Sequence, residues 1–202
     1  MASQGLVDLS SFGKNIVVAV IGASGGIGKA LIDQFVNYDH IKTLYSFSRC
    51  NPKITAPNVR WKTMDIEDEE SIQSAAETVA KNGHSINILI IATGFLHEKD
   101  RFYPEKTWRS LTRESFTKAF SINTIGPAII GKHFLPLLEK TQKTVFTALS
   151  ARVGSIEDNR TGGWHAYRAS KAALNMIIKN FSIELEQKKP NSICIGLHPG
   201  TV

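Results

Sequence analysis

The stretch Ile16-Val17-Val18-Ala19-Val20-Ile21-Gly22-Ala23-Ser24-Gly25-Gly26-Ile27-Gly28 decides the fold of this chain. Its first six residues are all apolar, which predicts a strand buried on both faces of a parallel sheet. Glycines follow at the spacing G-x-x-x-G-x-G, and Ile27, Leu31 and Phe35 then repeat every four residues, as one face of a helix does. Glycines between a strand and a helix let the backbone turn tightly and approach a pyrophosphate at the helix N-terminus. The stretch therefore predicts a dinucleotide-binding unit, and a glycine turn without a ligand is the alternative.

The alternation of strand and helix continues to the end of the chain. Six short apolar runs cover residues 16–21, 43–48, 59–63, 86–92, 144–150 and 192–197. Amphipathic segments between them predict helices, including a long one over about 113–140, kinked at Pro127, and a last one over about 167–188. This order predicts an α/β fold with a Rossmann-type, doubly wound parallel sheet in a three-layer α/β/α arrangement.

Composition and length exclude several classes of protein. The 202 residues are 42% hydrophobic and 21% charged, which predicts a single globular domain over residues 1–202. No apolar run approaches 18 residues and the first residues lack a secretory signal, so we expect no membrane partner. Two cysteines in unrelated contexts, Cys50 and Cys194, are typical of free thiols in the reducing cytoplasm.

The charged residues and histidines do not form recognisable binding motifs. The formal net charge is +6, but the lysines and arginines are scattered and no run of five basic residues occurs. We therefore expect no nucleic-acid partner. The six histidines have no metal-ligand spacing with the cysteines, so we expect no metal site.

Tyr167 and Lys171 are four residues apart in the last predicted helix. This spacing places a phenol and an ammonium group on one helical face. A neighbouring cation favours the phenolate and lowers a phenol pKa that is ordinarily about 10. Such a tyrosine could exchange a proton near neutral pH, although the spacing also occurs by chance in many helices.

The end of the second predicted strand indicates which dinucleotide is bound. An NAD-binding protein places an Asp or Glu about 20 residues beyond the glycine loop, where it contacts the adenosine ribose. Here the segment Ser46-Phe47-Ser48-Arg49 contains no acid. The guanidinium of Arg49 could instead bind a 2′-phosphate, which favours NADP over NAD. A solvated arginine at the strand end is the alternative.

Together these motifs resemble the short-chain dehydrogenase/reductase family over nearly the whole chain. Gly22-x-x-x-Gly26-x-Gly28 is similar to its cofactor loop and Tyr167-x-x-x-Lys171 to its active-site pair. Ser150 stands seventeen residues before the tyrosine, where the family has its catalytic serine, and Asn123 is similar to the asparagine of the family's tetrad. The loops around residues 150–156 and 162–164 resemble those of the C-factor and sniffer-type carbonyl reductases.

The resemblance implies a set of cofactor contacts. Besides the glycine loop and the active-site pair, it includes the ends of the second to fourth strands and the turn after the sixth. The implied residues are Gly22, Ser24, Gly26, Ile27, Gly28, Ser48, Arg49, Asp65, Ile66, Thr93, Gly94, Tyr167, Lys171, Pro199, Gly200 and Val202.

The resemblance also implies a reaction, the transfer of a hydride between NADP and a small carbonyl or alcohol. Tyr167 would be the general acid and base, and Lys171 would hold its pKa down and contact the nicotinamide ribose. Ser150 would hydrogen-bond the carbonyl oxygen, and Asn123 would hold a water in a proton relay. An NADP-binding signalling or regulatory protein with little turnover, like the C-factor, is the alternative. The family further implies a homodimer or homotetramer.

Three features depart from the family pattern. Ile91 and Ala92 replace two asparagines that usually stabilise the central strand, and Ile21 replaces a threonine before the glycine loop. The sequence ends at Val202, whereas the family continues with a substrate-binding lid and a seventh strand. We therefore expect a fold truncated before these elements. The long irregular stretch 95–111 is expected to contact the substrate or to pack on the domain.

Overall fold

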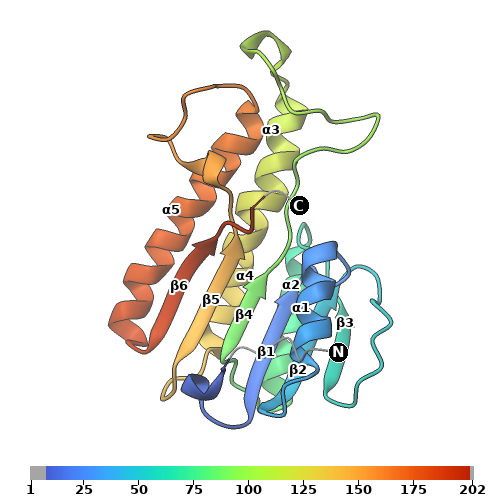
Figure 1. Ribbon diagram of the computed structural model, residues 1–202, viewed down its shortest axis with the longest axis vertical. Coiled ribbons are helices and arrows are strands. Elements are labelled where there is room, and N and C mark those ends of the chain that lie inside the picture. The colour runs from blue at the N-terminus through green and yellow to red at the C-terminus, as the bar shows by residue number, and fades with distance from the viewer. Residues whose placement is uncertain (1–7, 201–202) are drawn as a thin grey trace, which may run out of the picture.

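The computed structural model describes residues 8–200, which form a doubly wound parallel sheet with helices on both faces (Figure 1). The strand order is β3-β2-β1-β4-β5-β6, and each neighbouring pair is parallel. The strands are β1 Ile16–Ile21, β2 Ile41–Ser48, β3 Val59–Thr63, β4 Ile88–Ile91, β5 Thr144–Leu149 and β6 Ser192–Leu197. All six predicted strands are therefore confirmed. The central strands β1 and β4 are buried along their whole length, which explains their unbroken apolar sequences, whereas the edge strands β3 and β6 are partly exposed.

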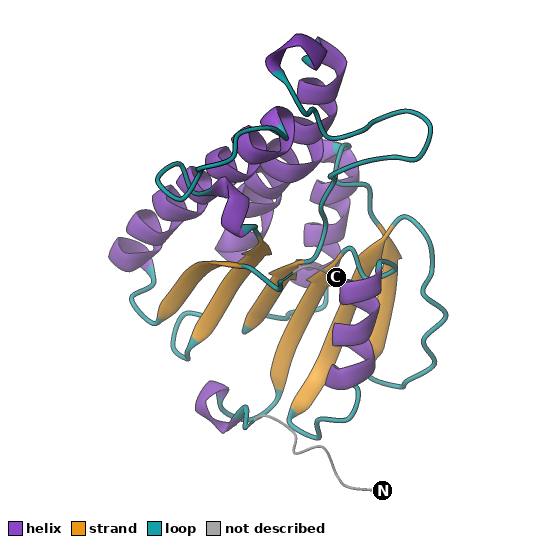
Figure 2. Ribbon diagram, turned by 45° about the horizontal axis from the view of Figure 1, so that its top comes forward, coloured by secondary structure: helices purple, strands orange, loops and turns teal. Residues whose placement is uncertain are grey.

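The helices form one layer on each side of the sheet (Figure 2). They are α1 Gly26–Phe35, α2 Glu69–Lys81, α3 Arg113–Phe120, α4 Gly126–Phe134 and α5 His165–Lys188. One hydrophobic cluster joins α2, α4 and α5 to residues such as Val17 and Ala19 of β1, and a second joins α1 to the alternate residues of the same strand. The predicted three-layer α/β/α arrangement is confirmed. Within residues 8–200, no helix is long and apolar enough to cross a membrane.

The long helix predicted over 113–140 is interrupted. Its path consists of α3, a π-helical turn Ser121–Ile125, α4 and a 3-10 turn Leu135–Leu137. Pro127 lies in the first turn of α4, where a missing N–H is tolerated, rather than at a kink inside one continuous helix. The irregularity is the π turn just before it, in which the N–H of Gly126 donates to the carbonyl of Ser121. The prediction of one kinked helix was therefore wrong.

The strand order reverses between β1 and β4. The chain moves outward from β1 to β2 and β3, then crosses back and continues from β4 to β5 and β6. β1 and β4 are parallel neighbours, but the connection after β1 runs toward β2 at one side of the sheet and the connection after β4 runs toward β5 at the other. In open α/β sheets the crevice beyond the carboxyl ends of such strands is where ligands bind.

Candidate active site

The glycine loop connects β1 to α1 in a conformation that depends on two of its glycines. Gly22 has φ +85°, and a Cβ there would lie 2.8 Å from Cγ2 of Thr93. A Cβ on Gly28 would collide with the carbonyl oxygen of Gly22, so this helix can approach the loop only without a side chain. A Cβ on Gly26 would meet no atom within 4 Å, which leaves open space at the N-terminus of α1. The loop therefore has the shape that an approaching phosphate requires.

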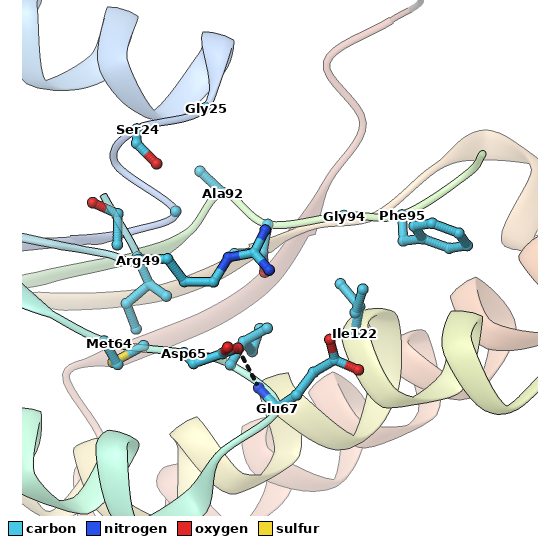
Figure 3. Close-up of a pocket in the computed structure, with 15 residues that line it drawn as sticks. Ser24, Gly25, Arg49, Met64, Asp65, Glu67, Ala92, Gly94, Phe95 and Ile122 are labelled. Atoms are coloured by element: carbon cyan, nitrogen blue, oxygen red, sulfur yellow. Dashed lines mark hydrogen bonds between the residues drawn. The ribbon is translucent and has the colours of Figure 1, made fainter. Parts of the chain in front are cut away.

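A cleft of about 280 Å³ extends from this loop across the ends of β2, β3 and β4 (Figure 3). Arg49 projects into it, and the Asp65 carboxylate, which accepts a hydrogen bond from the Glu67 N–H at 3.0 Å, lies on the opposite wall. The predicted cofactor residues that line this cleft are Gly22, Ser24, Ser48, Arg49, Asp65, Ile66, Thr93 and Gly94. Tertiary structure thus brings together residues from four separate strand ends.

Ser48 lines the cleft, but its hydroxyl group is already engaged. Its Oγ donates to the Cys50 carbonyl oxygen at 2.7 Å and accepts from Nε1 of Trp61 at 3.3 Å, and the residue is buried. These contacts hold the turn that carries Arg49. Ser48 therefore shapes the cleft, and its proton is not free for a ligand.

A second cleft of about 730 Å³ adjoins the first and shares Gly25, Ala92, Thr93 and Gly94 with it. The predicted residues that line it are Gly26, Ile27, Thr93, Gly94, Ser150, Tyr167, Lys171, Pro199 and Gly200. Val202 lies outside the described residues. Oγ1 of Thr93, on the wall common to both clefts, is buried without a hydrogen-bond partner among residues 8–200. Because buried polar atoms are rarely left unsatisfied, this orphaned hydroxyl fits a site that takes a polar ligand.

Lys171 reaches the second cleft from α5 and is almost completely buried. Its side chain is 2% exposed, and Nζ donates to the carbonyl oxygen of Leu149 at 2.7 Å. Nζ also lies 5.8 Å from the centre of the Tyr167 ring. Burial disfavours the ammonium form and lowers the pKa of Lys171 to about 8.

The pKa of Tyr167 moves in the direction opposite to the one expected. Burial raises the pKa of this phenol above its ordinary value of 10, because the phenolate would lose its hydration. The Lys171 ammonium, which was expected to lower that pKa, is itself buried and donates to Leu149 instead. In this arrangement Tyr167 is a protonated acid at neutral pH.

Asn123 lies in the π-helical turn, and its side chain bonds the chain just beyond β4. Oδ1 accepts from the Phe95 N–H and Nδ2 donates to the Phe95 carbonyl oxygen, both at 2.8 Å. Nδ2 also donates to Oγ of Ser170 at 3.0 Å, so both amide protons are used. The residue four positions on is Pro127, which has no N–H to donate to the Asn123 carbonyl.

Glu105 is a structural residue of the site that sequence reasoning missed. Trp164, which precedes α5, has φ 51° and makes no side-chain cap. Glu105, from the irregular stretch 95–111, accepts two hydrogen bonds from the backbone at the start of α5 instead. Its carbonyl oxygen accepts from the Trp164 N–H at 2.5 Å, and its Oε2 accepts from the Ala166 N–H at 3.3 Å. The buried carboxylate also complements the positive end of the helix dipole. Glu105 thus anchors the long loop to the helix turn that carries Tyr167.

Removing this anchor is expected to destabilise the fold. We expect Glu105→Ala to lower the free energy of unfolding by about 1–2 kcal/mol, the usual range for losing a helix cap. Glu105→Gln keeps an acceptor and should lose less. Glu98→Ala, which removes an exposed carboxylate from the same loop, is the matched control. Urea unfolding measures the difference, and equal free energies of unfolding for the Glu105→Ala and Glu98→Ala proteins would contradict the role of Glu105 as a helix cap.

Comparisons with known proteins agree with this geometry. A family model described as short chain dehydrogenase matches residues 16–202. An uncharacterized oxidoreductase of Schizosaccharomyces pombe is 30% identical over 203 residues, which cover 93% of this chain and 74% of that protein. C-signal of Myxococcus xanthus is 36% identical over 85 residues, which cover 42% of this chain and 50% of that protein.

Solved structures share the fold. Carbonyl reductase Sniffer of D. melanogaster superposes with a TM-score of 0.80 at 22% identity, covering 93% of this chain and 81% of that one. An NADPH-bound carbonyl reductase from chicken fatty liver superposes with a TM-score of 0.78 at 25% identity, covering 99% and 85%. The matched family model spans the glycine loop, both clefts and the tyrosine–lysine pair. The chain therefore belongs to the short chain dehydrogenase family of NAD(P)-dependent oxidoreductases.

Proposed function

We propose that this chain uses NADP to interconvert a small carbonyl compound and its alcohol, with Tyr167 as the general acid and base. The observation that carries the proposal is that Ser150, Tyr167 and Lys171 line one cleft, which opens into the cleft of the glycine loop. Proton-transfer groups and a dinucleotide-shaped cradle at the same sheet edge are what a hydride-transfer reaction needs.

The residues present fit this cofactor. The open N-terminus of α1 at Gly26 would take the pyrophosphate, and the orphaned Oγ1 of Thr93 would gain a polar partner. Arg49 would bind the 2′-phosphate that distinguishes NADP from NAD. Asp65 and Ile66 would border the adenine, and Pro199 and Gly200 would lie on the nicotinamide side.

When bound, the reduced cofactor supplies a hydride to the carbonyl carbon. Tyr167, protonated at neutral pH, gives its phenolic proton to the carbonyl oxygen. Ser150 donates a hydrogen bond to the same oxygen and stabilises its developing negative charge. Lys171 supplies positive charge behind the phenol, and its attachment to Leu149 keeps the ammonium group in place.

A turnover assay with a panel of aldehydes, ketones and quinones tests this proposal. NADPH consumption that requires both substrate and Ser150 would support it. Tight NADPH binding without turnover on any compound would instead favour an NADP-binding regulatory protein, the alternative suggested by the resemblance to C-signal. Assembly as a homodimer or homotetramer and a cytoplasmic location stay predictions, which light scattering and cell fractionation can test.

The cofactor preference should depend on Arg49. We expect Arg49→Ala to raise the KM for NADPH by about 10-fold to 100-fold, as expected for losing a charge-assisted hydrogen bond, and to leave the KM for NADH nearly unchanged. Arg60→Ala removes an exposed arginine from the neighbouring strand β3, outside the cleft, and is the matched control. A wild-type protein that prefers NADH would exclude the assignment of Arg49.

A further inference from the structure

Asn175 forms a hydrogen bond with Ser150 that none of the sequence motifs indicates. It lies on α5 four residues after Lys171 and eight after Tyr167, so the three side chains share one helical face. Ser150 Oγ donates to Oδ1 of Asn175 at 2.6 Å, across 25 residues of sequence. Figure 1 shows α5 running beside β6, whose other neighbour is β5, the strand that ends just before Ser150. Among the hydrogen bonds of residues 8–200, Ser150 is the one partner of the Asn175 side chain.

The neighbouring strand leaves room for this pair. A Cβ on Gly196 of β6 would lie 3.4 Å from Cβ of Ser150 and 3.6 Å from Oδ1 of Asn175. A methyl group at position 196 would therefore touch both residues at ordinary van der Waals distance. Ser150, Asn175 and Gly196 also line one open cavity of about 470 Å³, and Ser150 is shared between this cavity and the cleft of Tyr167 and Lys171.

A serine hydroxyl has one proton and two lone pairs. While that proton is donated to Asn175, it cannot be donated to a carbonyl substrate. Once it turns toward the substrate, the Ser150 oxygen is free to accept a hydrogen bond from Nδ2 of the same amide. An amide, which carries both an acceptor and donors, can hold the oxygen in either state.

We infer that Asn175 is a positioning residue for Ser150, which holds the hydroxyl oxygen in place and releases its proton to the substrate carbonyl. This inference rests on the proposed function, in which Ser150 contacts that carbonyl. Asparagine is a poor helix former, and in the middle of α5 its exposed side chain bonds Ser150 and no other group among residues 8–200. The side chain acts through Ser150, so removing it should matter only while Ser150 is present.

A double-mutant cycle in the NADPH-dependent reductase assay tests this inference. We expect Ser150→Ala to lower kcat by about 10²-fold to 10³-fold, the range for losing one donor to a developing oxyanion. Asn175→Ala should lower kcat by about tenfold, as for one hydrogen bond, without changing the Kd for NADPH. The double variant should be no slower than Ser150→Ala alone, because the two residues act as one unit.

Two further variants keep the result interpretable. Asn175→Leu keeps a side chain of similar shape without polar atoms, so it serves if Asn175→Ala unfolds, and it should show the same kcat loss. Asn180→Ala removes an exposed asparagine from the same helix and should leave kcat unchanged.

The outcomes separate the inference from the proposed function. Additive losses in the double variant, or full activity of both Asn175 variants, would overturn the positioning role while the reductase assignment stands. A wild-type protein without turnover on any carbonyl compound would overturn both.

Discussion

Replacing Tyr167 by phenylalanine is expected to lower kcat for carbonyl reduction by about 10²-fold to 10⁴-fold, the usual contribution of a positioned general acid. The ring is kept and only the phenolic hydroxyl group is lost. Because burial raises the pKa of this phenol, the wild-type group is protonated across the neutral range. The measurement is NADPH oxidation under saturating substrate.

NADPH binding, followed by fluorescence, should change far less than kcat in the Tyr167→Phe protein. Tyr103→Phe is the matched control, since that phenol is 65% exposed in the long loop and should be dispensable. A Tyr167→Phe protein with full activity would exclude this residue as the acid. Loss of both activity and NADPH binding would point instead to a structural defect.

Replacing Lys171 by methionine is expected to lower the activity and, at neutral pH, to raise the free energy of unfolding. Activity should fall because the cation behind Tyr167 is lost. Stability should respond to pH, because burial lowers the folded-state pKa of Lys171 to about 8 from an ordinary 10.5. Below pH 8 the lysine is charged in both the folded and unfolded states, and the folded protein bears the full cost of burying that charge.

Between pH 8 and pH 10.5 the unfolded state binds the proton more tightly than the folded state, so the wild-type protein gains stability as pH rises. Methionine does not titrate. The stability of the Lys171→Met protein relative to wild type should therefore be greatest below about pH 8 and decline by roughly 3 kcal/mol toward pH 10.5. Urea unfolding at several pH values measures this difference.

Lys179→Met is the control, since it removes an exposed lysine from the same helix. Its stability relative to wild type should not follow the pH dependence of the Lys171 variant. A difference between wild type and Lys171→Met that is independent of pH would show that burial does not shift this lysine.

The strand positions and the glycine loop could be predicted because their requirements are local. A strand covered on both faces must be apolar throughout, as β1 and β4 are, and the predicted runs match all six strands to within two residues at each end. The interrupted helix was harder. In the π turn Ser121–Ile125, the Asn123 side chain forms hydrogen bonds with Phe95 and Ser170. These contacts are distant in sequence, so amphipathic periodicity alone does not predict them.

The roles of the side chains likewise divide into those that the sequence predicts and those that depend on the folded structure. Tyr167 and Lys171 were evident from their spacing, but the pKa shift of the tyrosine was not, because desolvation depends on what surrounds the ring. Glu105 anchors Ala166 across 61 residues, and Asn175 meets Ser150 across 25. Neither residue stands in a motif.

The sequence by itself determined where the candidate functional residues stand relative to the strands. A glycine loop follows the first strand, a basic residue follows the second, and a serine, a tyrosine and a lysine stand near the end of the chain. Only the tertiary structure decided which groups are paired and which are free. It engaged the hydroxyl of Ser48, both amide protons of Asn123 and the ammonium of Lys171, and it left Oγ1 of Thr93 without a partner among residues 8–200. The reason is physical, since hydrogen bonding and desolvation act between atoms that are close in space, and the folded sheet edge brings together residues that are far apart in the chain.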